Sequence, residues 1–410
     1  MASASALALL GTSVAAASAV QAKTHPAAHA PATYKRVCSV NRTPGIMACM
    51  ALMRTNVKQF RQDSVGHDSA PVGEGYGPSS LQSAYNLTSA SSSGGMGESV
   101  AVVDAFNDPD AVSNLATYRS AWGLPACDSS TGAGCLSVVN QNGAASPLPA
   151  NAGDTGWDVE ESLDVDMVSA ICPNCHIYLV EANQPNTYAL GTSVKSAVKK
   201  LHIDFVSNSY GGSQGAKDGT YDTDYYKQPG AAITASAGDD GYLVSYPAAS
   251  PYVTSVGGTS LLQTGVGRGW TETVWDGSGG GCASKNSPRP TWQKYKVTQC
   301  ANRLDNDVAA VADPDTGVAI YDTYSEGGWL EVGGTSVASP IIASVFALAG
   351  TPKAGTYPVS YIYDHTSDLY DVTLGSNGSC KKTVWCNAGT GYDGPTGWGT
   401  PDGTSAFSSG

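Results

Sequence analysis

The chain has 410 residues, of which only 14% are charged, against about a quarter in typical soluble domains. Asp and Glu (35) outnumber Lys and Arg (22), which gives a net charge of −13. This balance argues against nucleic acid and membrane surfaces as partners, because both select for basic patches.

The first 22 residues are uncharged, are rich in Ala, Leu and Val, and end in a small residue, Ala22. This pattern predicts a signal peptide over residues 1–22 and a secreted, extracellular protein. Residues 23–75 are expected to be an N-terminal extension or short propeptide, because the Gly/Pro/Ser-rich passage over 69–80 is typical of a linker. No later stretch reaches about 18 uninterrupted apolar residues, so no membrane span is expected.

Residues 76–410 alternate between short β-branched runs and helical patterns. Such alternation predicts one α/β domain built around a mostly parallel central sheet flanked by helices. The expected strands are 99–105, 176–182, 203–207, 232–236 and 252–256, and the clearest helices are 159–170, 192–201 and 336–349.

Ten cysteines follow one another in close pairs, which favours disulfides formed in an oxidising compartment. Zinc binding and a redox pair are the alternatives for Cys172 and Cys175, but no second motif of that spacing is present to complete a zinc site. Nearest-neighbour pairing gives Cys38/Cys49, Cys127/Cys135, Cys172/Cys175, Cys282/Cys300 and Cys380/Cys386.

The sharpest motif is GGTSVASP, residues 333–340. It places Ser336 between a glycine turn and a helix start, where free N–H groups favour a developing oxyanion. A lone serine there would be read as a helix cap. The full string resembles the nucleophile segment shared by subtilisins and sedolisins, the serine-carboxyl peptidases. The resemblance implies a subtilisin-like fold.

The general base separates those two families. Subtilisins carry a histidine in a His-Gly-Thr-His motif, and none of the six histidines here has that setting. The segment WDVEESLDVD, residues 157–166, instead resembles the sedolisin Glu-x-x-Leu-Asp motif, which assigns the catalytic pair to Glu160 and Asp164. Four residues apart, they share one helix face. Glu161 and Asp166 are expected to face solvent or to be structural.

The loop SAGDDG, residues 236–241, places Asp239 where sedolisins carry an oxyanion-hole aspartate and subtilisins an asparagine. A carboxylate remains a usable base in acid, where histidine is already protonated. Asp239 must be protonated to donate to an oxyanion. Both requirements favour low pH.

Near the C-terminus, residues 370–378 and 388–401 resemble the sedolisin calcium site. The resemblance implies a structural calcium ion, and hard oxygen ligands with glycine-rich backbone suit that ion. Its ligands would be the carboxylates of Asp371 and Asp393 and the carbonyls of Val372, Gly389 and Gly391.

The resemblance therefore implies a secreted, acid-acting, monomeric endopeptidase that takes protein or peptide substrates. Three alternatives remain: an exopeptidase with the same triad, an inactive peptide-binding relative, and a subtilisin-type enzyme using Asp104 and an unrecognised histidine. The short extension is a departure, since sedolisins usually carry a longer folded propeptide.

Overall fold

The computed structural model describes Met1 and residues 33–56 and 75–410. The two longer segments belong to one compact unit. The predicted signal peptide, apart from Met1, lies outside the described residues. Among the described residues, no helix combines the length and the apolar character needed to cross a membrane.

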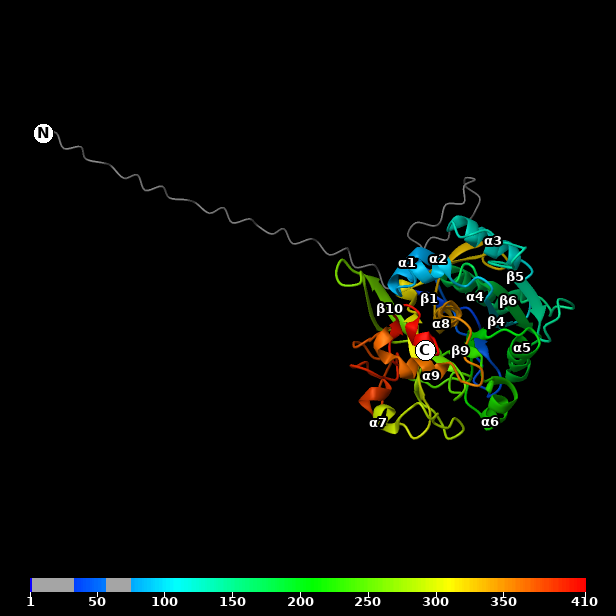
Figure 1. Cartoon of the computed structure of the whole chain (residues 1–410). Helices are drawn as coiled ribbons and strands as arrows, with labels where there is room; N and C mark the ends of the chain where they lie inside the picture. The colour runs from blue at the N-terminus through cyan, green and yellow to red at the C-terminus, as the bar shows by residue number, and fades with distance from the viewer. Residues whose placement is uncertain (2–32, 57–74) are drawn as a thin grey trace. The chain divides into compact units, whose positions relative to one another are not determined.

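An eight-stranded sheet forms the centre of the fold (Figure 1), in the order β11-β10-β9-β7-β4-β6-β5, with β14 also pairing with β10. Every pairing is parallel except that of β10 with β11. This confirms the predicted α/β fold. The strands are β4 (Ser99–Ala105), β5 (Leu136–Asn140), β6 (His176–Ala182), β7 (Phe205–Asn208), β9 (Ala232–Ser236), β10 (Thr254–Gln263), β11 (Trp270–Val274) and β14 (Val308–Val311).

Helices cover both faces of this sheet. Alternate residues of β4 point to opposite faces, so Val100 and Val102 lie in one apolar core and Ala101 and Val103 in another. Helices α4 (Trp157–Ile171) and α8 (Thr335–Ala349) pack against each other in the first core. Helix α5 (Thr187–Lys199) lies in the second. The remaining α-helices of the described residues are α1 (Pro78–Ala84), α2 (Thr88–Ser93), α3 (Ala111–Ala121), α6 (Asp218–Tyr221), α7 (Tyr295–Thr298) and α9 (Val359–Asp364).

The expected elements agree closely with the observed ones. Three strands, β4, β6 and β9, have the predicted bounds, while β10 continues well past its predicted end. Helix α5 begins five residues earlier than predicted, because the Asn186 side chain accepts a hydrogen bond from the Ala189 N–H and caps the helix there.

The second sheet joins strands from both sides of the predicted domain boundary at residue 76. Its strands are β1 (Tyr34–Arg36), β3 (Leu52–Arg54), β16 (Gly328–Gly333) and β15 (Val318–Asp322), in that order. A short strand β2 (Ala48–Cys49) also pairs with β8 (Tyr210–Gly211). Residues 33–56 are therefore part of the fold. The pairing partners lie up to 281 residues downstream, as for Leu52 and Gly333, so local sequence could not reveal them.

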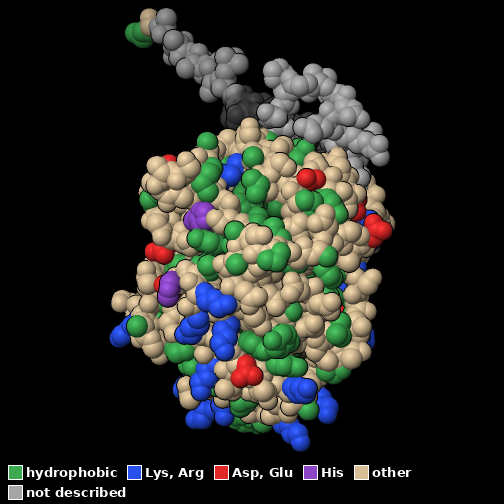
Figure 2. Space-filling view, turned by 90° about the vertical axis from the view of Figure 1, so that its right-hand side faces the viewer, with side chains coloured by type: hydrophobic (Ala, Val, Ile, Leu, Met, Phe, Trp, Pro, Cys, Tyr) green, Lys and Arg blue, Asp and Glu red, His purple; other side chains and the backbone are tan. Residues whose placement is uncertain are grey.

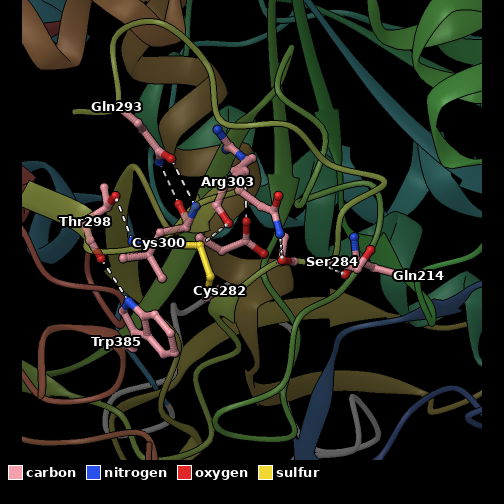
Figure 3. The surroundings of a disulfide bond; sticks show 12 residues. Gln214, Cys282, Ser284, Gln293, Thr298, Cys300, Arg303 and Trp385 are labelled. Carbon is pink, nitrogen blue, oxygen red and sulfur yellow. Dashed lines mark hydrogen bonds and ion pairs between the residues drawn. A yellow bond between two sulfur atoms is a disulfide. The ribbon is translucent and has the colours of Figure 1, made fainter. Parts of the chain in front are cut away.

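Two further two-stranded ladders complete the sheets: β12 (Gly281–Cys282) with β13 (Leu304–Asp305), and β17 (Leu369–Tyr370) with β18 (Thr400–Pro401). All five predicted cysteine pairs form disulfides. Around Cys282–Cys300 the chain is also tied by polar contacts (Figure 3): the Trp385 indole donates to the Thr298 carbonyl, and the Ser284 N–H donates to the Gln214 side chain.

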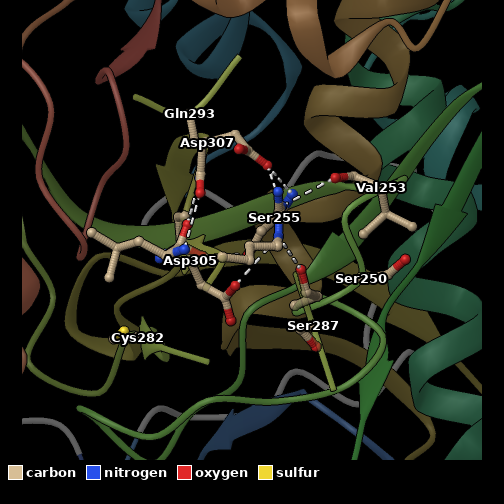
Figure 4. Close-up of polar contacts among 12 residues, drawn as sticks. Ser250, Val253, Ser255, Cys282, Ser287, Gln293, Asp305 and Asp307 are labelled. Atoms are coloured by element: carbon tan, nitrogen blue, oxygen red, sulfur yellow. Dashed lines mark hydrogen bonds and ion pairs between the residues drawn. The ribbon is translucent and has the colours of Figure 1, made fainter. Parts of the chain in front are cut away.

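A buried arginine ties the same region to the sheet. Arg303 has no exposed surface and donates to Asp307 at 2.5 Å and to the Val253 carbonyl at 3.1 Å. It also lies 3.5 Å from Asp305, while Asp307 accepts the Ser255 N–H from β10 (Figure 4). Burial raises the pKa of Asp305 to about 7, although Arg303 opposes the rise.

The acidic composition does not produce a uniformly acidic surface. On the face in Figure 2, Asp and Glu side chains are few and scattered, whereas Lys and Arg gather on its lower part. In the described part of the chain, 17 of the 35 acids of the sequence are buried. Many of the acidic side chains therefore lie inside the protein, where ionising a carboxyl group is costly.

We expect Arg303→Met to destabilise the fold by about 3–5 kcal/mol, because it leaves two buried carboxyls without their cation. The measurement is denaturant unfolding in a Ser336→Ala background, which prevents self-digestion. Lys195→Met, at an exposed position, serves as the control and should stay within about 0.5 kcal/mol of the parent. Equal effects of the two substitutions would contradict this account.

Candidate active site

Ser336 is the second residue of α8 and has no exposed surface. Gly334 precedes the helix with a φ of 98°, a conformation that favours glycine. The Ser336 hydroxyl donates to the backbone carbonyl of Ser209 at 3.1 Å. The Ser336 N–H donates to the carbonyl of Met50 at 3.2 Å. The predicted nucleophile thus lies at a helix N-terminus, as the motif implied.

Glu160 and Asp164 lie on α4, which packs against α8. Both carboxyls are fully buried. Asp164 accepts a 2.6 Å hydrogen bond from the Ser209 hydroxyl. Because the Ser209 carbonyl also accepts from Ser336, one residue connects the acidic helix to the serine.

The carboxyls strongly influence one another. Burial, followed by the charges of Asp164 and Asp104, raises the pKa of Glu160 well above its ordinary range, while the nearby Ser336 hydroxyl opposes the rise. Burial and then Asp104 likewise raise the pKa of Asp164. Asp104, at the C-terminal end of β4, has its pKa raised to about 8 by burial. Three carboxyls in one dry site cannot all be ionised, so the cluster holds protons.

Asp239 follows β9 and is held through one oxygen. Its Oδ1 accepts hydrogen bonds from both the N–H and the hydroxyl of Thr335, each at 2.8 Å. Its Oδ2 is buried and has no hydrogen-bond partner in the described structure. Burial raises the pKa of Asp239 to about 7, although the Thr335 bonds oppose the rise. A proton on Oδ2 would make this atom a donor next to Ser336.

A pocket of about 460 Å³ adjoins this group and is bordered by Gly211, Gly238, Asp239, Ser245 and Met50. Gly211 and Gly212, the last residues of the segment 207–212, form part of its wall. The wall is held in part by the Cys282–Cys300 region, since Cys282 also borders the pocket.

Of the two alternatives expected for Glu161 and Asp166, the structure excludes exposure to solvent, because both residues are fully buried. Asp166 accepts the Tyr321 N–H at 2.9 Å, which is a structural role. For Glu161, burial and then the charge of Glu181 raise its pKa.

Sequence reasoning missed three contributors to the site. No motif pointed to Ser209, Thr335 was only part of the serine motif, and Asp104 was considered only as a partner for a histidine. The one available signal was an acid near the end of a buried strand, since Asp104 is the next-to-last residue of the run SVAVVDA.

The predicted calcium residues meet at one loop. Asp371 accepts the Gly391 N–H at 2.8 Å, and Asp393 accepts the Gly389 N–H at 3.1 Å. No three His, Cys, Asp or Glu side chains of the described residues group as a metal site. A calcium ion would therefore combine two carboxylates with backbone carbonyls such as that of Val372, a donor set that this ion accepts.

Comparison with known proteins defines the family. Residues 133–399 match the family model described as the subtilase family. The chain is 27% identical to sedolisin of Pseudomonas sp. (strain 101), over 82% of this chain and 61% of that protein. It is 32% identical to kumamolisin of Bacillus sp. (strain MN-32), over 75% and 59%. The chain belongs to the subtilase family, in its sedolisin branch.

Two other similarities bear on this sedolisin-type chain. Human tripeptidyl-peptidase 1 is 27% identical over 80% of this chain and 63% of that protein. The structure of Pseudomonas sedolisin complexed with pseudo-iodotyrostatin has a TM-score of 0.66 and 25% identity, covering 81% and 96% of the two chains. The chain spans about three fifths of the length of the curated relatives it matches.

The buried acids predict that stability falls as the pH rises. Their ordinary pKa values are near 4, and burial in the fold raises those of Asp239, Asp104 and Glu181 to about 7, 8 and 9. Such groups stabilise the fold fully below about pH 4, and the contribution is lost as pH rises through the folded values. We expect the thermal midpoint of the Ser336→Ala protein to fall between pH 4 and pH 9.

The matched control is Asp104→Asn in the same background. It removes one of these titrations, so its thermal midpoint should depend less on pH and should exceed that of the parent at pH 8. A parent midpoint that rises from pH 4 to pH 8 would contradict the account.

Proposed function

We propose that this chain is an acid-acting serine-carboxyl endopeptidase that hydrolyses peptide bonds in protein or peptide substrates. The observation that carries the proposal is the placement of Asp239: Thr335 holds its Oδ1, and its unpartnered Oδ2 lies beside Gly334, two residues before the nucleophile. An oxyanion there would receive the Ser336 N–H and a proton from Asp239.

In the proposed mechanism Ser336 attacks the substrate carbonyl carbon and Glu160 takes the hydroxyl proton. The Ser336 hydroxyl first turns from the Ser209 carbonyl toward Glu160. Asp164, fixed by the Ser209 hydroxyl, holds Glu160 in position and shares the proton of the pair. Glu160 returns the proton to the leaving amine, and water then hydrolyses the acyl-enzyme by the same groups.

Acidic conditions suit both the oxyanion donor and the general base of this mechanism. Asp239, with its pKa raised to about 7 by burial, is protonated in acid and can donate. The pair of Glu160 and Asp164 must hold one proton between them and carry one negative charge. Opening of the cleft to water favours that ionisation. Activity is therefore proposed to decline as Asp239 loses its proton toward neutral pH.

An endopeptidase is favoured over an exopeptidase by the shape of the cleft. A continuous run of this chain, residues 46–54, crosses the nucleophile and pairs with neighbouring strands on both sides of it. A cleft that accepts chain on both sides does not require a substrate terminus. The similarity to tripeptidyl-peptidase 1 keeps an exopeptidase as the second candidate.

We also propose secretion and a structural calcium ion. Five disulfides support an oxidising compartment. Calcium would be held by the carboxylates of Asp371 and Asp393 and by the carbonyls of Val372, Gly389 and Gly391. It would neutralise two nearby acids and fix the C-terminal loops.

Substitutions should separate the proposed roles. On an end-blocked peptide at pH 4, Ser336→Ala should lose at least about 10³-fold in kcat/KM. Asp239→Ala should lose about 10²–10³-fold, as for removal of an oxyanion donor. Asp239→Asn, which donates at any pH, should retain more activity and extend it toward neutral pH. Asp154→Asn, at an exposed position, is the control with unchanged kinetics.

Two results would contradict these roles. Full activity of Glu160→Gln would remove the proposed base. Hydrolysis only of peptides with a free amino terminus would favour the exopeptidase.

Chelation tests the proposed ion. Excess EDTA at pH 6 should lower the thermal midpoint of the Ser336→Ala protein, because removal of calcium leaves two close carboxylates facing each other. Asp371→Asn in that background should start lower and no longer respond to EDTA. A midpoint unchanged by EDTA, with no calcium found by elemental analysis, would contradict the site.

A further inference from the structure

A second pair of buried acids lies beside the proposed catalytic pair. Glu161 follows Glu160 on α4, and Glu181 is the next-to-last residue of β6. Neither Glu161 nor Glu181 has any exposed surface. Both oxygens of Glu161 lack a hydrogen-bond partner in the described structure. The mechanism proposed above uses neither of these two residues, so the cost of burying them needs a reason of its own.

The strand pattern directs Glu181 toward α4. Ile177 and Leu179 precede it at alternate positions of β6, and both lie in the core that contains α4. Side chains at alternate positions of a strand point to the same face of the sheet, so Glu181 points to this face as well. On α4, Val165 lies one turn after Glu161 and belongs to the same core. Helix α4 packs against both β4 and β6 (Figure 1), which brings the two carboxyls together.

Acids surround the two carboxyls. Asp104 of β4 is the register partner of Glu181, so their side chains leave the sheet side by side. Asp108 is 2% exposed, and its Oδ2 has no partner among the described residues. The Asn107 side-chain amide lies 3.1 and 3.2 Å from the two Glu181 oxygens. Because no Lys, Arg or His in the described part of the chain forms an ion pair with Glu161 or Glu181, protons must balance their charge.

The electrostatics agree with this geometry. Burial, followed by the charges of Glu181 and Asp104, raises the pKa of Glu161 well above its ordinary value. Burial, followed by the charges of Asp108 and Asp104, raises the pKa of Glu181 to about 9. The Asp108 backbone opposes the rise in both cases, so it lies near both carboxyls. Two close carboxyls are stable when the O–H of one donates to the other, whereas two carboxylates in a dry site repel each other.

Asp104 connects this pair to the proposed general base. Its charge raises the pKa of Glu160 as well as that of Glu161. Glu160 and Glu161 are neighbours on one helix, so a displacement of α4 from β6 moves both side chains. A shift of about 1 Å in a catalytic group can lower a rate by about 10²-fold.

We propose that Glu161 and Glu181 share a proton and that this pair is a positioning device, which holds α4 against β6 and keeps Glu160 in place for the reaction. The inference rests on the proposed function and adds regulation of that site by pH. While the pair holds a proton, an O–H bond joins the helix to the strand. When the last proton leaves, two like charges repel and α4 moves away from β6. The stabilisation is complete in acid and is lost as the pH rises through the raised values of the folded state.

Two substitutions of Glu181 test the positioning role in the full chain, with kcat and KM measured on an end-blocked peptide from pH 3 to pH 7. Glu181→Gln supplies an N–H at every pH, so it should keep the kcat of the parent at pH 4 and exceed it at pH 6. Glu181→Leu fills the space but cannot form the bond, so it should lower kcat at pH 4 by at least about tenfold and leave KM unchanged. Asp166→Asn changes a buried acid further along α4 that accepts the Tyr321 N–H. It is the matched control and should keep the pH profile of the parent.

Proton counting tests the pair without catalysis. In a Ser336→Ala background, calorimetric unfolding at pH 6 in buffers of different ionisation heat gives the number of protons released. The double variant Glu161→Gln/Glu181→Gln should release about one to two fewer protons than its parent, because both carboxyls ionise in the unfolded chain. Asp154→Asn, at an exposed position, should release the same number as the parent.

Each failure has a distinct meaning. An unchanged proton count would overturn the shared proton. An unchanged kcat in a folded Glu181→Leu protein would overturn the positioning role. If Glu181→Leu fails to fold, equal pH profiles of Glu181→Gln and the parent would overturn that role instead. Absence of all hydrolysis by the parent would overturn the proposed function, while the proton count would still decide whether the pair exists.

Discussion

The structure depends above all on carboxyl groups that have been removed from water. A buried carboxyl without a cation is stable mainly in its neutral form. Glu160, Asp164 and Asp104 lie together at the site, and Glu161 and Glu181 extend the buried acidic region. Among the described residues, Arg119 and Arg303 are the buried cations, too few to neutralise these acids. The fold and the proposed chemistry therefore favour the same condition, a supply of protons.

The parallel sheet brings the chemical groups to one edge. Asp104 is the next-to-last residue of β4, Ser209 follows β7, and Asp239 follows β9. The carboxyl ends of parallel strands meet at the same edge of a sheet, and α4 and α8 pack nearby with Glu160 and Ser336. The segments are distant in sequence, yet Ser209 and Thr335 join them through side-chain hydrogen bonds. Such links hold the proposed acid pair, the proposed nucleophile and the proposed oxyanion donor in fixed positions relative to one another.

The N-terminal segment shows how one backbone can serve both fold and site. Strands β1 and β3 extend the second sheet, and the stretch between them is held in the cleft by pairing with β8. The disulfide that closes this stretch joins two residues only 11 positions apart, so it stiffens the loop locally. Because the loop completes a sheet, its position in the cleft follows from the same pairing that stabilises the fold.

The sequence by itself determined the fold class, the five disulfide pairs and the family, and it named Ser336, Glu160, Asp164 and Asp239. These features are local: a motif, a helical spacing or cysteines close in the chain. Only the tertiary structure decided that Ser209, Thr335 and Asp104 join the site, that Glu161 is buried, and that residues 33–56 belong to the fold. Each of these facts depends on a contact between distant segments, and strand pairing and burial are set by the packing of the whole chain.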